Sequence, residues 1–197
     1  MQMEIVVHPL SPDRWNDLEE VFGAKGCSTA RGCWCMYYRE SGAIRVPAGE
    51  KPSECRKRKL KDLAGSGSAP GLIGYLEGRP VGWVSLGPRS EYPRLRRSPV
   101  MKPVDDMPVW SIVCFVVAGP FRHQGVATGL LRGAIEYARE MGATMLEAYP
   151  VDRPEPGRDE WLWFGAKTMF DRAGFIEVAR RRPGRPVVRL DLTQLQE

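Results

Sequence analysis

The stretch from Ser111 to Ala138 reads SIVCFVVAGPFRHQGVATGLLRGAIEYA and combines a strand, a loop and a helix. Residues 109–117 form a nearly continuous apolar run, which is typical of a strand buried on both faces. After a loop over residues 118–124, apolar side chains recur every three or four positions, and this spacing predicts a helix that ends at Gly142. We expect the fold to be built around this strand–loop–helix unit.

The turn into the helix has the features of an anion-binding site. It reads Arg122-His123-Gln124-Gly125-Val126-Ala127. The start of a helix carries N–H groups without partners and a partial positive charge, so it favours phosphate. Gly125 and Ala127 lack bulk that would keep a ligand from the backbone, and Arg122 adds a cation suited to phosphate. The turn matches neither G-x-x-x-x-G-K-[ST] nor G-x-G-x-x-G, and the alternative is an ordinary junction with a basic first turn.

The remaining segments alternate between strand and helix patterns. We expect strands over residues 3–9, on both sides of the turn 77–80, and over 109–117, 144–149, 175–181 and 187–192. We expect helices from Ser11 to Phe22, over residues 54–64 after a Ser53 cap, from Gly125, and over 161–173. A long connection over residues 88–108 shows no regular pattern and is therefore a functional or mobile segment.

This order of elements predicts the fold class. Strands and helices are mixed, with hairpins toward both ends and a strand–helix–strand unit between them, so we expect an α/β (α+β) domain of three layers around one mixed sheet. The chain has 197 residues, a length that fits a single domain over residues 1–197.

The amino-acid composition limits the classes of binding partner that we expect. Lys and Arg number 29 and Asp and Glu 24, giving a net charge of +5, which is too mild for a dedicated nucleic-acid binder. The basic segment Arg56 to Lys61 leaves nucleic-acid binding as an alternative. We expect no membrane partner and no secretion signal, because no apolar run approaches ~20 residues and the start lacks a basic region. Five cysteines, an odd number, favour reduced thiols and a cytoplasmic location.

The sequence resembles one known family. Residues 122–127 match the pattern [QR]-x-x-G-x-[GA] of the GNAT superfamily of acyl-CoA-dependent N-acetyltransferases, and MFDRAGF at 169–175 is similar to that family's helix-to-strand ending. The resemblance covers most of residues 4–192 and is weakest over 27–65. It implies a GNAT-like domain in which the strands at 109–117 and 144–149 splay apart, with a cofactor-binding core at about 109–150.

The resemblance also implies a cosubstrate and a reaction. Acetyl-CoA would donate its acetyl group directly to an amine, with the pantetheine arm on strand backbone and the pyrophosphate on N–H groups of the turn. The cofactor-binding residues that it implies are Phe115, Val116, Val117, Arg122, His123, Gln124, Gly125, Val126, Ala127, Thr128 and Gly129. The acceptor is expected to be a small-molecule amine, bound by a monomer or a homodimer. The alternatives are acetylation of a protein N-terminus or lysine, and a non-catalytic CoA-binding or sensing domain.

The sequence departs from the family where a general acid is usual. Phe170 stands where a tyrosine often protonates the leaving thiolate, and Trp163 stands where an asparagine is frequent. The acid would then be Tyr149, Tyr37, Tyr38 or water.

A base is also needed, because an ammonium group must lose its proton before it attacks. Glu147 is the first candidate, since it lies in the strand beside the expected gap, and Asp152 is the second. The alternative is that Glu147 is a carboxylate on the surface of the sheet. We therefore predict Glu147 and Tyr149 as catalytic residues.

A segment rich in cysteine and aromatic residues, Cys27 to Gly42, has no clear period. We expect an acceptor pocket there and after the loop at 153–160, and the alternative is buried packing. The predicted substrate-binding residues are Trp34, Cys35, Tyr37, Trp161 and Trp163. A zinc site made by Cys27, Cys33, Cys35 and Cys55 is a further alternative, but the spacing is unusual and we predict no metal.

Overall fold

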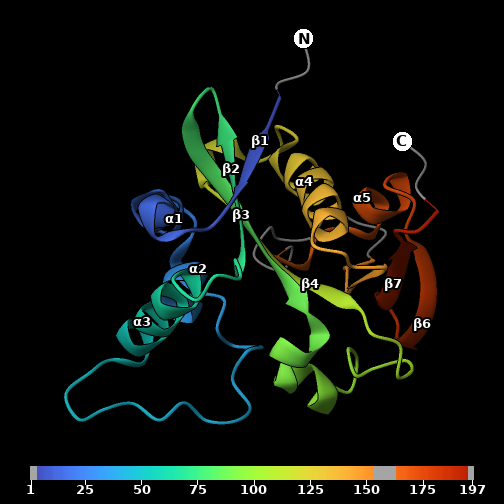
Figure 1. The fold of residues 1–197 in the computed structure, drawn as a ribbon, viewed down its shortest axis with the longest axis horizontal. Helices are drawn as coiled ribbons and strands as arrows, with labels where there is room; N and C mark the ends of the chain where they lie inside the picture. Colours follow the sequence, from blue (N-terminus) through green and yellow to red (C-terminus); the bar gives the residue numbers. More distant parts are fainter. Residues whose placement is uncertain (1–3, 153–162, 195–197) are drawn as a thin grey trace.

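The computed structural model describes residues 4–152 and 163–194. They form a sheet of seven strands in the order β1-β2-β3-β4-β5-β7-β6 (Figure 1). The strands are β1 (Val6–Pro9), β2 (Gly71–Leu76), β3 (Arg79–Pro88), β4 (Trp110–Val117), β5 (Met145–Ala148), β6 (Ile176–Arg182) and β7 (Arg185–Asp191). Only β4 and β5 run parallel, and the other neighbours are antiparallel, which confirms the predicted mixed sheet.

Helices cover both faces of this sheet, as predicted. They are α1 (Trp15–Gly23), α2 (Ser28–Cys33), α3 (Pro52–Ala64), α4 (Val126–Glu140) and α5 (Lys167–Arg172). Figure 1 shows α1, α2 and α3 on one side of β3 and α4 on the other. Leu130 and Ala134 of α4 are fully buried, and on the opposite face of the sheet the ring of Phe22 in α1 meets the edge of the Trp83 ring in β3. The two faces therefore have separate apolar clusters.

The pairing of β4 with β5 is short. It joins Trp110, Ser111 and Ile112 of β4 to residues 146–148 of β5. Within the residues that the structure describes, residues 114–117 of β4 pair with β3 alone, and Val113 lies at an irregularity in that pairing. The two parallel strands thus part halfway along β4, as the resemblance implied.

Several predicted boundaries differ from the structure. Helix α3 begins at Pro52, and Lys51 is its N-terminal cap residue, whose backbone N–H donates to the carboxylate of Glu54. The predicted cap, Ser53, therefore lies inside the helix. The connection after β3 is not featureless, since it holds two short 3-10 helices, η2 (Arg89–Glu91) and η3 (Pro93–Arg97).

The predicted helix at 161–173 is short in the structure, where α5 begins only at Lys167. Gly165 has φ +77°, a left-handed conformation that interrupts a right-handed helix. Helix α2 was not predicted, because it spans only six residues with little apolar period.

Over residues 4–152 and 163–194, none of the helices has both the length and the apolar character required to cross a membrane.

The packing of α4 on β1 yields a prediction about stability. A Cβ added at Gly133 of α4 would lie 2.7 Å from the Cβ of Val7, whereas one at Gly23 of α1 would meet no atom within 4 Å. Gly133→Ala should therefore lower the free energy of unfolding by about 1–3 kcal/mol despite the higher helix propensity of alanine. Gly23→Ala should be neutral or slightly stabilising. Denaturant unfolding of both variants checks this, and an equally stable Gly133→Ala would contradict the close packing.

Candidate active site

The open edge of β4 exposes backbone groups of alternate residues. The N–H of Ala118 donates to the carbonyl of Val81 on β3 at 3.0 Å, so Val117 must face the other way. Its carbonyl indeed accepts from Nε of Arg122 at 3.3 Å. By the same alternation Phe115 faces the open edge, while Val116 faces β3. The prediction that Val116 holds pantetheine through its backbone therefore needs correction, because β3 already occupies that edge.

The turn before α4 keeps backbone N–H groups accessible. Gly125 precedes the helix with φ +81°, and a Cβ there would meet no atom within 4 Å. His123 is also left-handed, at φ +60°. The N–H groups of residues 126–128 have no acceptor one turn earlier within the helix. Gly129 differs, because its N–H donates to the carbonyl of Gly125 at 3.0 Å, so its predicted role in holding pyrophosphate is corrected.

Two side chains of this turn fold back onto the protein. Arg122 donates from Nη2 to the carbonyl of Gly26 at 2.8 Å, besides its bond to Val117. Gln124 donates from Nε2 to the carbonyl of Pro120 at 2.8 Å. Arg122 is predicted to bind phosphate through paired N–H groups, whereas in the structure one of its donors ties the turn to the loop after α1 and another ties it to the end of β4. Its charge still makes the turn electropositive.

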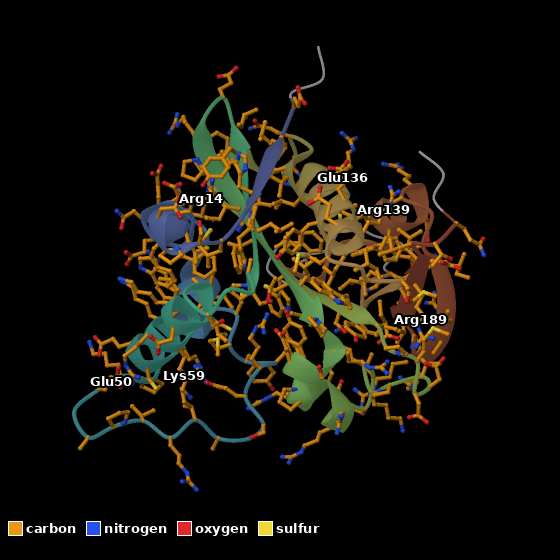
Figure 2. The ribbon with its side chains drawn as sticks, in the orientation of Figure 1. Arg14, Glu50, Lys59, Glu136, Arg139 and Arg189 are labelled. Carbon is orange, nitrogen blue, oxygen red and sulfur yellow. The ribbon has the colours of Figure 1, made fainter. Side chains whose placement is uncertain are left out.

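Glu147 lies in a buried ion-pair network. Its side chain is 0% exposed, and its Oε2 accepts from Nε of Arg189 at 2.8 Å. Nη1 of Arg89 lies 3.5 Å from Oε1. Figure 2 shows Arg189 on the β7 side of the sheet, where Asp105 accepts two further bonds from it at 2.6 and 2.8 Å. This pairing with Arg189 lowers the pKa of Asp105 to about 2.

Tyr149 completes the network. It is fully buried, and its hydroxyl donates to Oε1 of Glu147 at 2.8 Å and lies 3.0 Å from the hydroxyl of Ser111. Burial, followed by the charge of Glu147, raises the pKa of Tyr149. The structure thus brings the two predicted catalytic residues together, but it encloses both and occupies their polar atoms.

Trp34 and Cys35, which were predicted to line the acceptor pocket, lie in the hydrophobic core. The indole of Trp34 stacks on Trp15 at 5.8 Å and is 7% exposed, and Cys35 is also buried. Both predictions are corrected here, because neither side chain lines an open surface. Tyr37 is 45% exposed with Arg94 over its ring.

The rest of the predicted acceptor side is only partly described. The ring of Trp163 lies 5.9 Å from that of Phe164, and the side chain of Trp163 is half-buried. Trp161 lies outside the described residues. The second candidate base, Asp152, pairs with Nη2 of Arg180 at 2.7 Å.

A cleft of about 1060 Å³, which the sequence pattern did not predict, is formed by the segment after Cys35, the end of α3 and the end of η2. Charged side chains of both signs line it, among them Arg39, Glu40, Asp62 and Glu91. Lys59, labelled on α3 in Figure 2, also lines it. In the sequence, the residues that form this cleft belong to an aperiodic segment rich in charged residues. Such a pattern does not reveal that the surface is concave.

Two further side chains stand near the open edge. Phe170, in the position that the resemblance gives to a tyrosine, is buried with its ring 6.1 Å from that of Phe115. Tyr38 lies on the opposite face of the sheet, half-buried, with its ring 6.1 Å from Phe164. Burial raises the pKa of Tyr38.

The zinc alternative gains no support from the geometry. In the part of the chain that the structure describes, no three Cys, His, Asp or Glu side chains group as metal ligands. The thiol of Cys27 instead donates to the carbonyl of Val117, and that of Cys55 to the carbonyl of Arg45.

Comparison with known proteins agrees with this geometry. The model of the acetyltransferase (GNAT) family matches residues 34–170. Similar solved structures include an acetyltransferase of the GNAT family from Streptococcus agalactiae, at 11% identity, TM-score 0.56 and 95% coverage of each chain. A putative acetyltransferase of the GNAT family from Desulfovibrio desulfuricans has 17% identity and TM-score 0.52, with 95% of this chain and 99% of that chain covered.

A third similar structure is the polyamine N-acetyltransferase of Drosophila melanogaster, an enzyme that forms N-acetylagmatine. It has 13% identity and TM-score 0.51, with 95% of this chain and all of that chain covered. No curated protein matches the sequence.

The buried network yields a second prediction. Glu147→Gln leaves the guanidinium groups of Arg89 and Arg189 without their buried counter-charge, so the free energy of unfolding should fall by about 3 kcal/mol. Asp105→Asn removes a half-exposed partner of the same Arg189 and should cost about 1 kcal/mol or less. Equal losses in denaturant unfolding at pH 7 would show that burial of Glu147 does not set its contribution.

Proposed function

The chain belongs to the GNAT acetyltransferase family, and we propose that it transfers the acetyl group of acetyl-CoA to a primary amine of a small molecule. The observation that carries this proposal is the open edge of β4 with the accessible turn at its end. Transfer would be direct, in a complex that holds both substrates. Acetyl-CoA supplies the activated thioester, and the chain supplies the surfaces that hold and orient it.

The donors on this chain fit such a ligand. Backbone groups of Phe115 and Val117 face the open edge, as the amide groups of a pantetheine arm require. The N–H groups of residues 126–128 and the left-handed Gly125 form an electropositive start of α4 that suits a pyrophosphate. We assign the N–H of Phe115 to the carbonyl oxygen of the acetyl group, where a fixed donor stabilises developing negative charge.

Tyr38 is our candidate for the proton donor to the leaving thiolate. Phe170 has no proton to give, and the hydroxyl of Tyr149 already donates to Glu147. Tyr38 lies on the face of the sheet opposite α4, where Tyr38 and Cys114 of β4 pack against the same apolar cluster. Like any tyrosine hydroxyl, it carries a proton at neutral pH and therefore has one to donate. Glu147 would then orient its neighbours, and water would take the proton of the amine.

The cleft beside the end of α3 is the proposed route for the acceptor. Its lining includes Met36, which adjoins Cys35, and Cys35 belongs to an apolar cluster against which Cys114 of β4 packs. The carboxylates of Glu40, Asp62 and Glu91 would attract a cationic amine. A small amine is also what the fold neighbour named for N-acetylagmatine acts on. The five free thiols suit a reducing compartment, which supports a cytoplasmic location.

Binding of acetyl-CoA tests the turn. Gly125→Glu places a carboxylate where the pyrophosphate is expected, so calorimetric titration should show at least a tenfold loss of affinity for acetyl-CoA. Gly142→Glu is the matched control, because Gly142 has φ +79° and an equally open Cβ position at the other end of α4. Unchanged affinity in the folded Gly125→Glu protein, or no binding by the wild type, would refute the proposed function.

Acid catalysis by Tyr38 is tested separately. Tyr38→Phe removes the hydroxyl and keeps the ring, so kcat should fall by about 10²-fold while the Kd for acetyl-CoA is preserved. Tyr37→Phe serves as the control, since its ring is exposed and carries Arg94. The assay releases CoA from acetyl-CoA with polyamines and agmatine as acceptors. Equal kcat values for the two variants would remove Tyr38 from the mechanism.

A further inference from the structure

One cation in the wall of the cleft beside α3 is buried. The side chain of Arg39 lines this cleft and is 5% exposed. Its guanidinium lies 4.4 Å from the centre of the Tyr92 ring, and its Nη2 donates to the hydroxyl of Tyr92 at 2.8 Å and to the carbonyl of Pro70 at 3.1 Å. These contacts fix the position of the positive charge, so it is held ready for a partner in the cleft.

The bonding of Arg39 is incomplete. Its Nη1 is paired with Glu91, whose side chain is 37% exposed. Its Nε is buried and, among the described residues, has no hydrogen-bond partner. A buried donor without an acceptor is unfavourable, and a buried cation needs a closely held counter-charge. Because Glu91 is partly exposed, it can turn toward water and leave the guanidinium to another carboxylate.

The other charged groups of the cleft carry both signs. Glu40 is paired with Arg56, which lies outside the lining. Within residues 4–152 and 163–194, no ion pair engages the cleft residues Arg45, Lys59 and Asp62. Beyond the internal pairs, two cations and one carboxylate therefore face a ligand. A ligand with positive charge alone would leave both cations unmatched, whereas a ligand with a carboxylate and an amine matches both signs.

Arg39 also lies near the place that we assign to the acetyl group. The hydroxyl of Tyr92, which binds Arg39, lies 3.4 Å from that of Ser85 on β3. Ser85 is the register partner of Cys114 on β4, and neighbouring strands are about 4.8 Å apart. Cys114 directly precedes Phe115, whose N–H we assign to the acetyl oxygen. A single small molecule can therefore reach from Arg39 to the acetyl group.

We propose that the acceptor is an amino acid, whose carboxylate binds in the cleft at Arg39 while its amine receives the acetyl group. This proposal rests on the proposed function and narrows its small-molecule amine to one that carries a carboxylate. Arg45 and Lys59 attract the carboxylate, and Asp62 attracts the ammonium. In the transfer, the C–S bond of acetyl-CoA breaks and a C–N bond forms, water takes the proton of the amine, and the thiolate takes one from Tyr38.

Ligands that differ only in a carboxylate test this proposal. Calorimetry measures binding of each common amino acid to the full-length protein, with and without CoA. Each amino acid that binds is compared with its decarboxylated partner, for example L-arginine with agmatine or L-lysine with cadaverine. We expect at least one amino acid to bind tenfold or more tightly than its partner, and to have the higher kcat/KM in the assay of CoA release.

Variants of the cleft test which residues recognise the carboxylate. Arg39→Gln should weaken binding of the amino acid at least tenfold and leave binding of the decarboxylated amine unchanged or stronger, because it removes a cation. Lys59→Gln should act in the same direction by about threefold, since its charge is partly screened by solvent. Lys61→Gln is the matched control on the same helix, because Lys61 lies over the ring of Trp15 and outside the cleft, and it should change neither affinity.

The outcomes separate this proposal from the proposed function. Binding of no amino acid, equal binding of an amino acid and its decarboxylated partner, or full discrimination by Arg39→Gln would overturn the proposal. If Arg39→Gln does not fold, Lys59→Gln and the ligand pairs on the wild type still decide. Acetyl transfer to agmatine and to no amino acid would overturn the proposal and support the proposed function. A protein that does not bind acetyl-CoA refutes the proposed function, whereas discrimination that is lost in Arg39→Gln would still establish the carboxylate site.

Discussion

The parting of β4 from β5 is the constraint on which the rest of the site depends. A parallel pair with complete pairing would leave no backbone donors for a ligand. Here the pairing ends at Ile112 and Ala148, and the following residues of β4 face an open edge. The same strand leads through one turn into α4, so the free backbone of the strand and the free N–H groups of the helix are neighbours. Strand edge and helix start thus form one continuous binding surface.

Buried charged groups hold together the end of the sheet where β4 and β5 still pair. Ser111 and Glu147, which pair across β4 and β5, both contact the hydroxyl of Tyr149, and Arg189 reaches the same carboxylate from β7. Carboxylate and guanidinium groups are costly to bury, and mutual pairing offsets that cost only when geometry is good. The network therefore fixes three strands where they meet and leaves their continuations free to diverge. The role of Glu147 in this network explains why its carboxylate is buried away from solvent.

Much of the fold could be predicted because its signals are local. The apolar run of β4, the period of α4 and the glycine at its start are contiguous in sequence, and they also define the cosubstrate surface. The roles of Glu147, Trp34 and Cys35 could not be predicted, because each depends on partners far along the chain. A carboxylate in a strand has the same local pattern whether it faces water or Arg189. Similarly, aromatic residues in an aperiodic segment do not reveal that Trp34 stacks on Trp15.

The central claim is that acetyl-CoA binds along the open edge of β4 and the start of α4. Amide hydrogen exchange, resolved by residue with and without acetyl-CoA, tests it most directly. The account predicts that the ligand slows exchange at Phe115, Val117 and residues 126–128 and leaves Val116, already paired with β3, unchanged. Slowed exchange confined to the cleft beside α3, or none at these amides despite binding, would contradict it.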